Sequence, residues 1–179
     1  MRFLLLTLAL AAACASETKD PARLRVAVWS GDTPIRERAT LKSGAEINLA
    51  VEPVPACHVY VIHRGPGDEF NVLFPESGAS SQLEGARTVL EGNLDEKTGL
   101  ESLHVIASRE PLSELEQAIR SGAKSAIIAA VSEVRQRYEK VTVVAARPAP
   151  IGGLVRSPPE ALEYTFADVL CRTYAVDHR

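Results

Sequence analysis

The sequence predicts a mainly β (α+β) fold: an antiparallel, Ig-like β-sandwich with a helical pair inserted before the last two strands. Short runs that alternate apolar and polar residues follow one another with glycine and proline turns between them, which is typical of antiparallel sandwiches. Residues 57–75 contain the signals of a complete β-hairpin. After residue 112, apolar residues recur at the intervals of amphipathic helices.

The hairpin is the most specific local signal. β-Branched and aromatic residues over 57–63 predict its first strand, residues 65–68 its turn, and residues 70–74 its return strand. Gly67 supplies the positive φ that such a turn requires, and Pro75 lacks the amide proton needed to continue the ladder. In the first strand both the odd and the even positions are apolar, which predicts a strand covered on two faces.

The two helices are predicted by their ends and by an apolar stripe. Ser113 and Glu116 have the spacing of a capping box, and Gly122 is a typical terminator of the first helix. In the second helix an apolar stripe predicts packing against a sheet, with a partner-binding face as the alternative. The stripe consists of Ile127, Val131, Val134 and Tyr138.

Other strands are predicted by period-two alternation. We expect strands at residues 23–30, 38–41, 47–51, 88–90, 100–108, 141–145 and 163–176, and helices at about 113–121 and 124–139.

Length and composition indicate one soluble domain. The 179 residues are enough for one core, and 46% hydrophobic and 24% charged residues are ordinary for a globular protein. The net charge of −3 provides no basic surface for a phosphate backbone, so we expect no binding to nucleic acid.

The beginning of the chain predicts export. Arg2 is followed by an apolar run over residues 3–10 and then by small residues, which is the pattern of a signal peptide. Small residues directly before Cys14 are typical of a bacterial lipoprotein cleavage site, at which residues 1–13 are removed and Cys14 is lipidated. Ordinary cleavage after Ala15 is the alternative.

This interpretation also predicts the domain organisation and the location. Residues 14–22 form a polar tether, and residues 23–179 form a single domain. Lipid on Cys14 would hold that domain at a membrane. The periplasmic face of the outer membrane is favoured, because Ala15 is not the aspartate that often marks retention at the inner membrane. The inner membrane and the soluble periplasm are the alternatives.

Two cysteines, Cys57 and Cys171, are left once Cys14 is assigned to lipid. An exported protein folds in an oxidising compartment, so we expect a disulfide between them. In the chain-entropy model, closing so long a loop stabilises the protein by up to ~4–5 kcal/mol. The alternative is two separately buried free thiols, since unpaired cysteine packs well in apolar cores.

Three short motifs form a recognisable pattern. A strand of the form xVYVxxx leads through a glycine turn to LFP, and a later strand ends in alanine–serine. With these motifs the chain resembles the bacterial family catalogued as domain of unknown function 4384, over about residues 45–120 and more loosely over 23–176. The resemblance implies an extracytoplasmic or regulatory module of β-sandwich type without an assigned reaction. The motif residues are Val59, Tyr60, Val61, Leu73, Phe74, Pro75, Ala107 and Ser108.

Few residues predict chemistry. Cys57, His58 and His63 are close in sequence, but strand alternation places His58 on the other face, which favours partly solvated histidines over a metal site. Ser108 and His104 share a strand face, but no G-x-S-x-G turn surrounds the serine, which favours a strand-ending role over catalysis. We expect no catalytic residue, no metal and no cofactor.

The sequence therefore favours a non-enzymatic cell-envelope lipoprotein that acts as a binding or adaptor module for an envelope protein or glycan. The alternatives are a small extracytoplasmic hydrolase that uses a surface serine or histidine, and a structural subunit of an envelope complex. Loops at residues 76–84 and 148–159 are candidate contact surfaces, because binding residues concentrate on loops held by a rigid scaffold.

Overall fold

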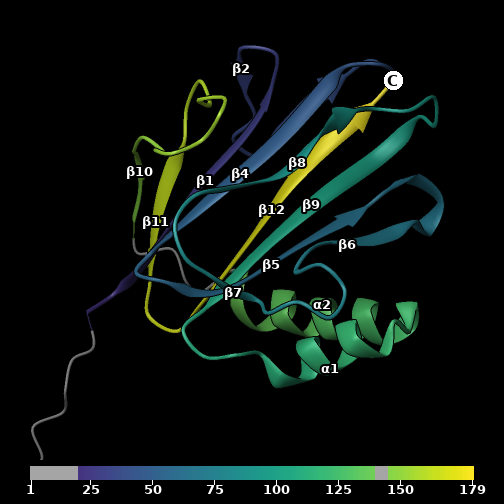
Figure 1. Cartoon of the computed structure of the whole chain (residues 1–179). Coiled ribbons are helices and arrows are strands. Elements are labelled where there is room, and N and C mark those ends of the chain that lie inside the picture. The colour runs from purple at the N-terminus through teal and green to yellow at the C-terminus, as the bar shows by residue number, and fades with distance from the viewer. Residues whose placement is uncertain (1–19, 140–144) are drawn as a thin grey trace, which may run out of the picture.

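Two six-stranded sheets pack face to face, and two helices cover the outer face of the second sheet (Figure 1). This computed structural model describes residues 20–139 and 145–179. The predicted β-sandwich with a helical pair is confirmed. The first sheet has the order β10-β11-β1-β4-β8, with β2 paired to β1, and the second has the order β3-β12-β9-β5-β6, with β7 paired to β5.

The strands of the first sheet are β1 (Ala22–Ser30), β2 (Thr33–Pro34), β4 (Glu46–Val54), β8 (Arg87–Asn93), β10 (Ala145–Pro148) and β11 (Leu162–Phe166). The strands of the second sheet are β3 (Arg38–Leu41), β5 (Cys57–Arg64), β6 (Phe70–Phe74), β7 (Gln82–Leu83), β9 (Gly99–Ser108) and β12 (Val169–His178). The helices are α1 (Ser113–Ser121) and α2 (Lys124–Tyr138).

The main core lies between the sheets and follows from strand alternation. Leu24, Val26 and Val28 point inward from β1, and Val59 and Val61 meet them from β5. The even positions of β5 point the other way, into a second core beneath the helices. β5 is therefore covered on both faces, as predicted.

The helical pair forms the third layer. Ile127 and Val131 of α2 are buried against the second sheet, and Val134 and Tyr138 are partly buried beside them, so the predicted stripe packs on the sheet. Gly122 ends α1 in the left-handed conformation, with φ of 65°. The predicted capping box is wrong: α1 begins at Ser113 itself, and its N-cap residue is Leu112, without a side-chain cap hydrogen bond.

The predicted hairpin is confirmed. β5 and β6 pair in antiparallel fashion around a single 3₁₀ turn, η1 (Pro66–Asp68). Gly67 has φ of 67°, as expected for the glycine of this turn. The amide of Gly65 donates to the carbonyl of Glu69 and closes the loop at 2.9 Å.

The carboxyl-terminal strands differ from the prediction. The single strand expected at residues 163–176 is two strands, β11 in the first sheet and β12 in the second, so the described part of the chain after the helices contains β10, β11 and β12 in place of the two strands expected. The sandwich is also not purely antiparallel, because β12 runs parallel to β3. Of the strand expected at 141–145, residues 141–144 lie outside the described residues, as do the predicted signal peptide and most of the tether.

The predicted disulfide is not formed. Cys57 and Cys171 are free and buried, Cys57 in the core between the sheets and Cys171 in the core beneath the helices. They lie on opposite faces of the second sheet, with β9 between their strands, so no side-chain rotation joins them. Burial raises the pKa of the Cys57 thiol to about 11 and that of Cys171 to about 12, and both are therefore protonated at neutral pH.

The two ends of the sandwich differ in what they carry. β1 begins at the end where Ala22 pairs with Phe166 and where β5 starts, and the guanidinium of Arg109 holds the carbonyl of Asp20 there. We call this the tether end. The opposite end, where β9 begins and β12 finishes, is the far end (Figure 1). A lipid on Cys14 would place the tether end next to the membrane.

Neither described helix is long and apolar enough to cross a membrane. The proline-rich loop at residues 149–161 packs on the outer face of the first sheet, where Ile151 and Ala161 bury Trp29 together with Ala27 and Ala50. This predicted contact loop is therefore partly a structural cover.

Candidate functional site

Polar side chains gather at both ends of the second sheet. At the tether end they lie on the helix-covered face, and at the far end they lie between the sheets. Alternation along β5 produces this division: His58 belongs with Tyr60 on the helix side, and His63 belongs with Val61 on the inner side.

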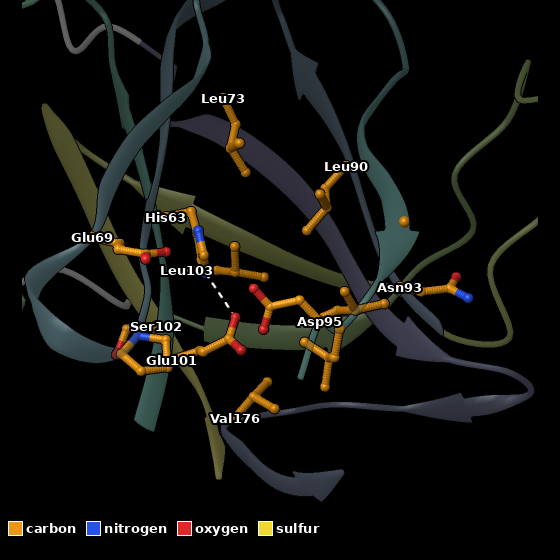
Figure 2. A pocket seen from close by; sticks show the side chains of 14 residues that line it. His63, Glu69, Leu73, Leu90, Asn93, Asp95, Glu101, Ser102, Leu103 and Val176 are labelled. Carbon is orange, nitrogen blue, oxygen red and sulfur yellow. Dashed lines mark hydrogen bonds and ion pairs between the residues drawn. The ribbon is translucent and has the colours of Figure 1, made fainter. Parts of the chain in front are cut away.

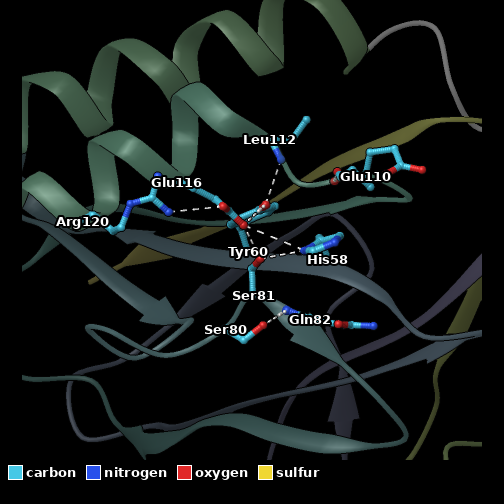
Figure 3. A network of polar contacts seen from close by, with 10 residues as sticks. His58, Tyr60, Ser80, Ser81, Gln82, Glu110, Leu112, Glu116 and Arg120 are labelled. Carbon is cyan, nitrogen blue, oxygen red and sulfur yellow. Dashed lines mark hydrogen bonds and ion pairs between the residues drawn. The ribbon is translucent and has the colours of Figure 1, made fainter.

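The tether-end network links β5, loop residue Ser81 and α1 (Figure 3). His58 Nδ1 lies 2.8 Å from Ser81 Oγ, and Ser81 Oγ donates to Glu116 Oε1 at 2.5 Å. The hydroxyl of Tyr60 donates to the same carboxylate oxygen at 3.1 Å and accepts from the amide of Leu112 at 3.0 Å. One carboxylate thus fastens the first turns of α1 to the sheet.

The direction of each proton in this network follows from the donor count. A hydroxyl has a single proton, and that of Ser81 goes to a carboxylate that can only accept. Ser81 Oγ must therefore accept from His58 Nδ1–H. In the neutral ring this leaves Nε2 of His58 as an acceptor, and the side chain is only partly buried.

The network also stabilises charge. The hydrogen bond from Ser81 is the main cause of the lowered pKa of Glu116; burial opposes it, and Tyr60 and Arg120 add to it. Burial raises the pKa of Tyr60 to about 12, so its hydroxyl stays a donor at physiological pH. The anionic carboxylate and its hydrogen-bond donors form a continuous polar wall.

A groove of about 400 Å³ runs beside this wall. Exposed residues of the stretch 76–80, part of the loop predicted as a contact surface, line it together with Glu116, Ile119 and Arg120 of α1. Arg120 is exposed at its rim, and the carboxylate of Glu76 pairs with Arg87 at 2.6 Å. The remaining lining residues are His58, Pro75, Gly78, Ala79, Ser80, Ser81, Pro111, Glu116 and Ile119.

A smaller pocket of about 160 Å³ lies at the far end, between the sheets (Figure 2). Its wall is apolar at Leu73, Leu90 and Leu103, and Glu101 contributes a carboxylate. His63 Nε2 donates to Glu101 Oε2 at 2.8 Å. The other carboxylate oxygen is bonded from outside the pocket, by a second histidine.

The structure separates the residues for which the sequence suggested chemistry. Ser108 and His104 are both buried and do not contact each other: Ser108 Oγ donates to the carbonyl of Glu110, and His104 Nδ1 bonds Thr173 at 3.0 Å. The alternative of a hydrolytic site formed by Ser108 and His104 is therefore wrong. Cys57, His58 and His63 are also apart, and no three His, Cys, Asp or Glu side chains within residues 20–139 and 145–179 converge as metal ligands would.

The motif segments, in contrast, come together. Val59 pairs with Ala107 and Val61 pairs with Phe74, so β9, β5 and β6 are neighbouring strands. Tyr60 belongs to the tether-end network, and Pro75 lines its groove. Sequence reasoning missed Ser81 and Glu116, because nothing in their local pattern connects a loop serine and a helix glutamate to His58.

The fold defines the chain as a β-sandwich domain with a helical layer. Comparisons of the chain with protein-family models, curated proteins and solved structures found no match, and the resemblance to domain of unknown function 4384 stays a prediction.

Proposed function

We propose that this protein is an exported, lipid-anchored envelope protein whose sandwich binds another envelope component through the tether-end groove. The observation that carries the proposal is the groove itself. Its concave surface combines the serine- and glycine-rich loop at residues 76–80 with the hydrogen-bonded wall around Glu116. Concave sites with a few placed polar groups are the usual form of a binding site.

The position of the groove agrees with an anchor on Cys14. Residues 14–21 span at most ~3.6 Å each, so the start of β1 would lie within about 30 Å of the membrane surface, and the groove is at the same end of the sandwich. Such a short reach restricts the partner to components close to that surface. This is the reason for placing the partner in the envelope rather than in free solution.

The chemistry of the groove favours an oxygen-rich ligand. Arg120 uses one N–H for Glu116, at 3.4 Å, and a guanidinium carries five donors. Ser80 Oγ accepts from the amide of Gln82, which leaves its own proton to donate. Carboxylates of a protein segment and hydroxyls of a glycan both match these donors.

Site-specific photo-crosslinking in cells tests the proposal. A photoreactive amino acid at Ser80, which is exposed in the groove, is expected to capture a defined envelope component. The same residue at Val155, which is fully exposed on the proline-rich loop, is the matched control and should capture none. Arg120→Ala should reduce the Ser80 adduct about tenfold, as the loss of a charged hydrogen bond would. Equal adducts at both positions, or none at Ser80, would contradict the groove as the binding site.

A further inference from the structure

Three side chains at the far end form a continuous hydrogen-bonded chain. Ser43 Oγ lies 3.0 Å from His178 Nε2, and His178 Nδ1 lies 3.1 Å from Glu101 Oε1. They come from the turn before β4, the end of β12 and the start of β9. The second oxygen of Glu101 accepts from His63, so the carboxylate is held on both sides.

The proton positions in this chain are determined by the acceptors. A carboxylate can only accept, so His178 Nδ1 carries the proton toward Glu101, and in the neutral ring Nε2 presents its lone pair. Ser43 must therefore donate its hydroxyl proton to Nε2. This is the tautomer and the order of atoms that a serine nucleophile with a histidine base and an orienting carboxylate requires.

Ser43 is accessible to solvent, and His178 beside it is not. Ser43 is exposed in a tight turn closed by the amide of Ala45 on the carbonyl of Lys42, at 3.0 Å. Gly44 has φ of 77° in this turn, a conformation that a residue with a Cβ adopts only with strain. His178 is fully buried, and the amide of Arg179 donates to Leu41, which fixes the end of β12 beside the turn.

The far-end pocket adjoins this chain. Glu101 lines it directly, and Leu94, which also lines it, accepts from the amide of Gly44 at 2.9 Å. An apolar cavity of ~150 Å³ is large enough for a benzene ring. The pocket is therefore of a size for a short acyl or aryl group.

We propose that Ser43, His178 and Glu101 form a serine acyl-hydrolase centre for small carboxylic esters. Ser43 Oγ attacks the ester carbonyl carbon while its proton passes to His178 Nε2. The bond to the alcohol oxygen breaks, and the alcohol leaves with that proton. Water then attacks the acyl-serine, gives its proton to the same nitrogen, and releases the carboxylic acid and free Ser43. Glu101 and His63 are positioning residues.

The surrounding amides set a limit on the rate. Those of Ser43, Gly44 and Ala45 donate to the carbonyls of Arg179, Leu94 and Lys42, so none of these three is preformed for an oxyanion. Each missing oxyanion donor costs about 10²–10³ in kcat. We expect slow turnover restricted to activated esters, and therefore a covalent probe is the sharper readout.

The experiment treats the mature protein with a fluorophosphonate probe and locates the adduct by peptide mass spectrometry. Label on Ser43 is expected, and His178→Gln should slow labelling about 100-fold, as removal of a general base does. Ser157→Ala, an exposed serine on the proline-rich loop outside this pocket, is the matched control and should label as the wild type does. Hydrolysis of p-nitrophenyl acetate should fall in parallel in Ser43→Ala, an exposed substitution that leaves the fold intact.

The positioning role has its own readout. Glu101→Gln should slow labelling, and Glu101→Asp should restore part of the rate, because the carboxylate rather than the shape of the side chain orients His178. Absence of label on Ser43 in the folded protein, or ester hydrolysis unchanged in Ser43→Ala, would overturn the proposal. Neither outcome bears on the proposed binding at the tether-end groove, which has its own test.

Discussion

Replacing Ile106 by alanine is expected to lower the free energy of unfolding by about 3–4 kcal/mol, the usual cost of emptying a buried aliphatic site. Ile106 is 0% exposed on β9 and faces the helices, where it packs in one cluster with Tyr60, Cys171 and the buried face of α2. The loss combines the transfer of the removed carbons to water with the cavity left beneath a rigid helical layer. Urea titration monitored by circular dichroism measures it.

The same substitution at Ile128 is the matched control. Ile128 lies on α2 but is 36% exposed, so truncation there should cost less than about 1 kcal/mol. If the two variants lose similar stability, the helices do not dock on this face of the second sheet, and the layer order described for the fold is wrong.

Acidification is expected to remove about 3 kcal/mol of stability through His104 alone. Burial, with Arg135 as the next cause, lowers the pKa of His104 from its ordinary 6.5 to about 4. Its neutral Nδ1–H donates to Thr173, whose own proton goes to Glu139 at 2.5 Å. A lowering of this size corresponds to about 3 kcal/mol by proton linkage.

The sign and the pH window follow from the two pKa values. Above pH 6.5 neither state holds the proton, and stability is unaffected. As the pH falls from 6.5 to about 4, the unfolded chain binds a proton that the folded protein excludes, so stability decreases. The carboxylates of Glu116, Glu139 and Glu163 have pKa values lowered from 4.5 in the folded protein. The stability that they contribute is therefore lost only as the pH falls below about 4.5.

His104→Asn isolates the contribution of His104, because the amide N–H of asparagine can replace Nδ1–H toward Thr173. The difference in unfolding free energy between variant and wild type should move in favour of the variant by about 3 kcal/mol between pH 7 and pH 4. Urea titrations at four pH values would show it. A difference that stays constant with pH would mean that His104 is not excluded from protonation in the folded protein.

Local signals predicted the hairpin and the helical stripe well. A turn glycine such as Gly67, a terminator such as Gly122 and the period of Ile127 and Val131 are properties of a short stretch of chain. The last strand pair was missed because Ala167 and Asp168, which carry the chain from one sheet to the other, include neither glycine nor proline.

Long-range features could not be predicted from these patterns. Alternation assigns faces within one strand, but the face of Cys171 relative to Cys57 depends on how β12, β9 and β5 align. For the same reason the disulfide prediction failed. Ser43 and His178 are separated by 135 positions, and only the parallel pairing of β3 with β12 brings them together.

We propose that lipid on Cys14 delivers the sandwich to a membrane. Fractionation of the native cells, with mass spectrometry of the mature amino terminus, measures this directly. We expect wild-type protein in the membrane fraction with a lipid-modified Cys14 as its first residue, and Cys14→Ser protein in the soluble fraction. Wild-type protein in the cytosol with Met1 retained, or Cys14→Ser protein that still sediments with membranes, would contradict it.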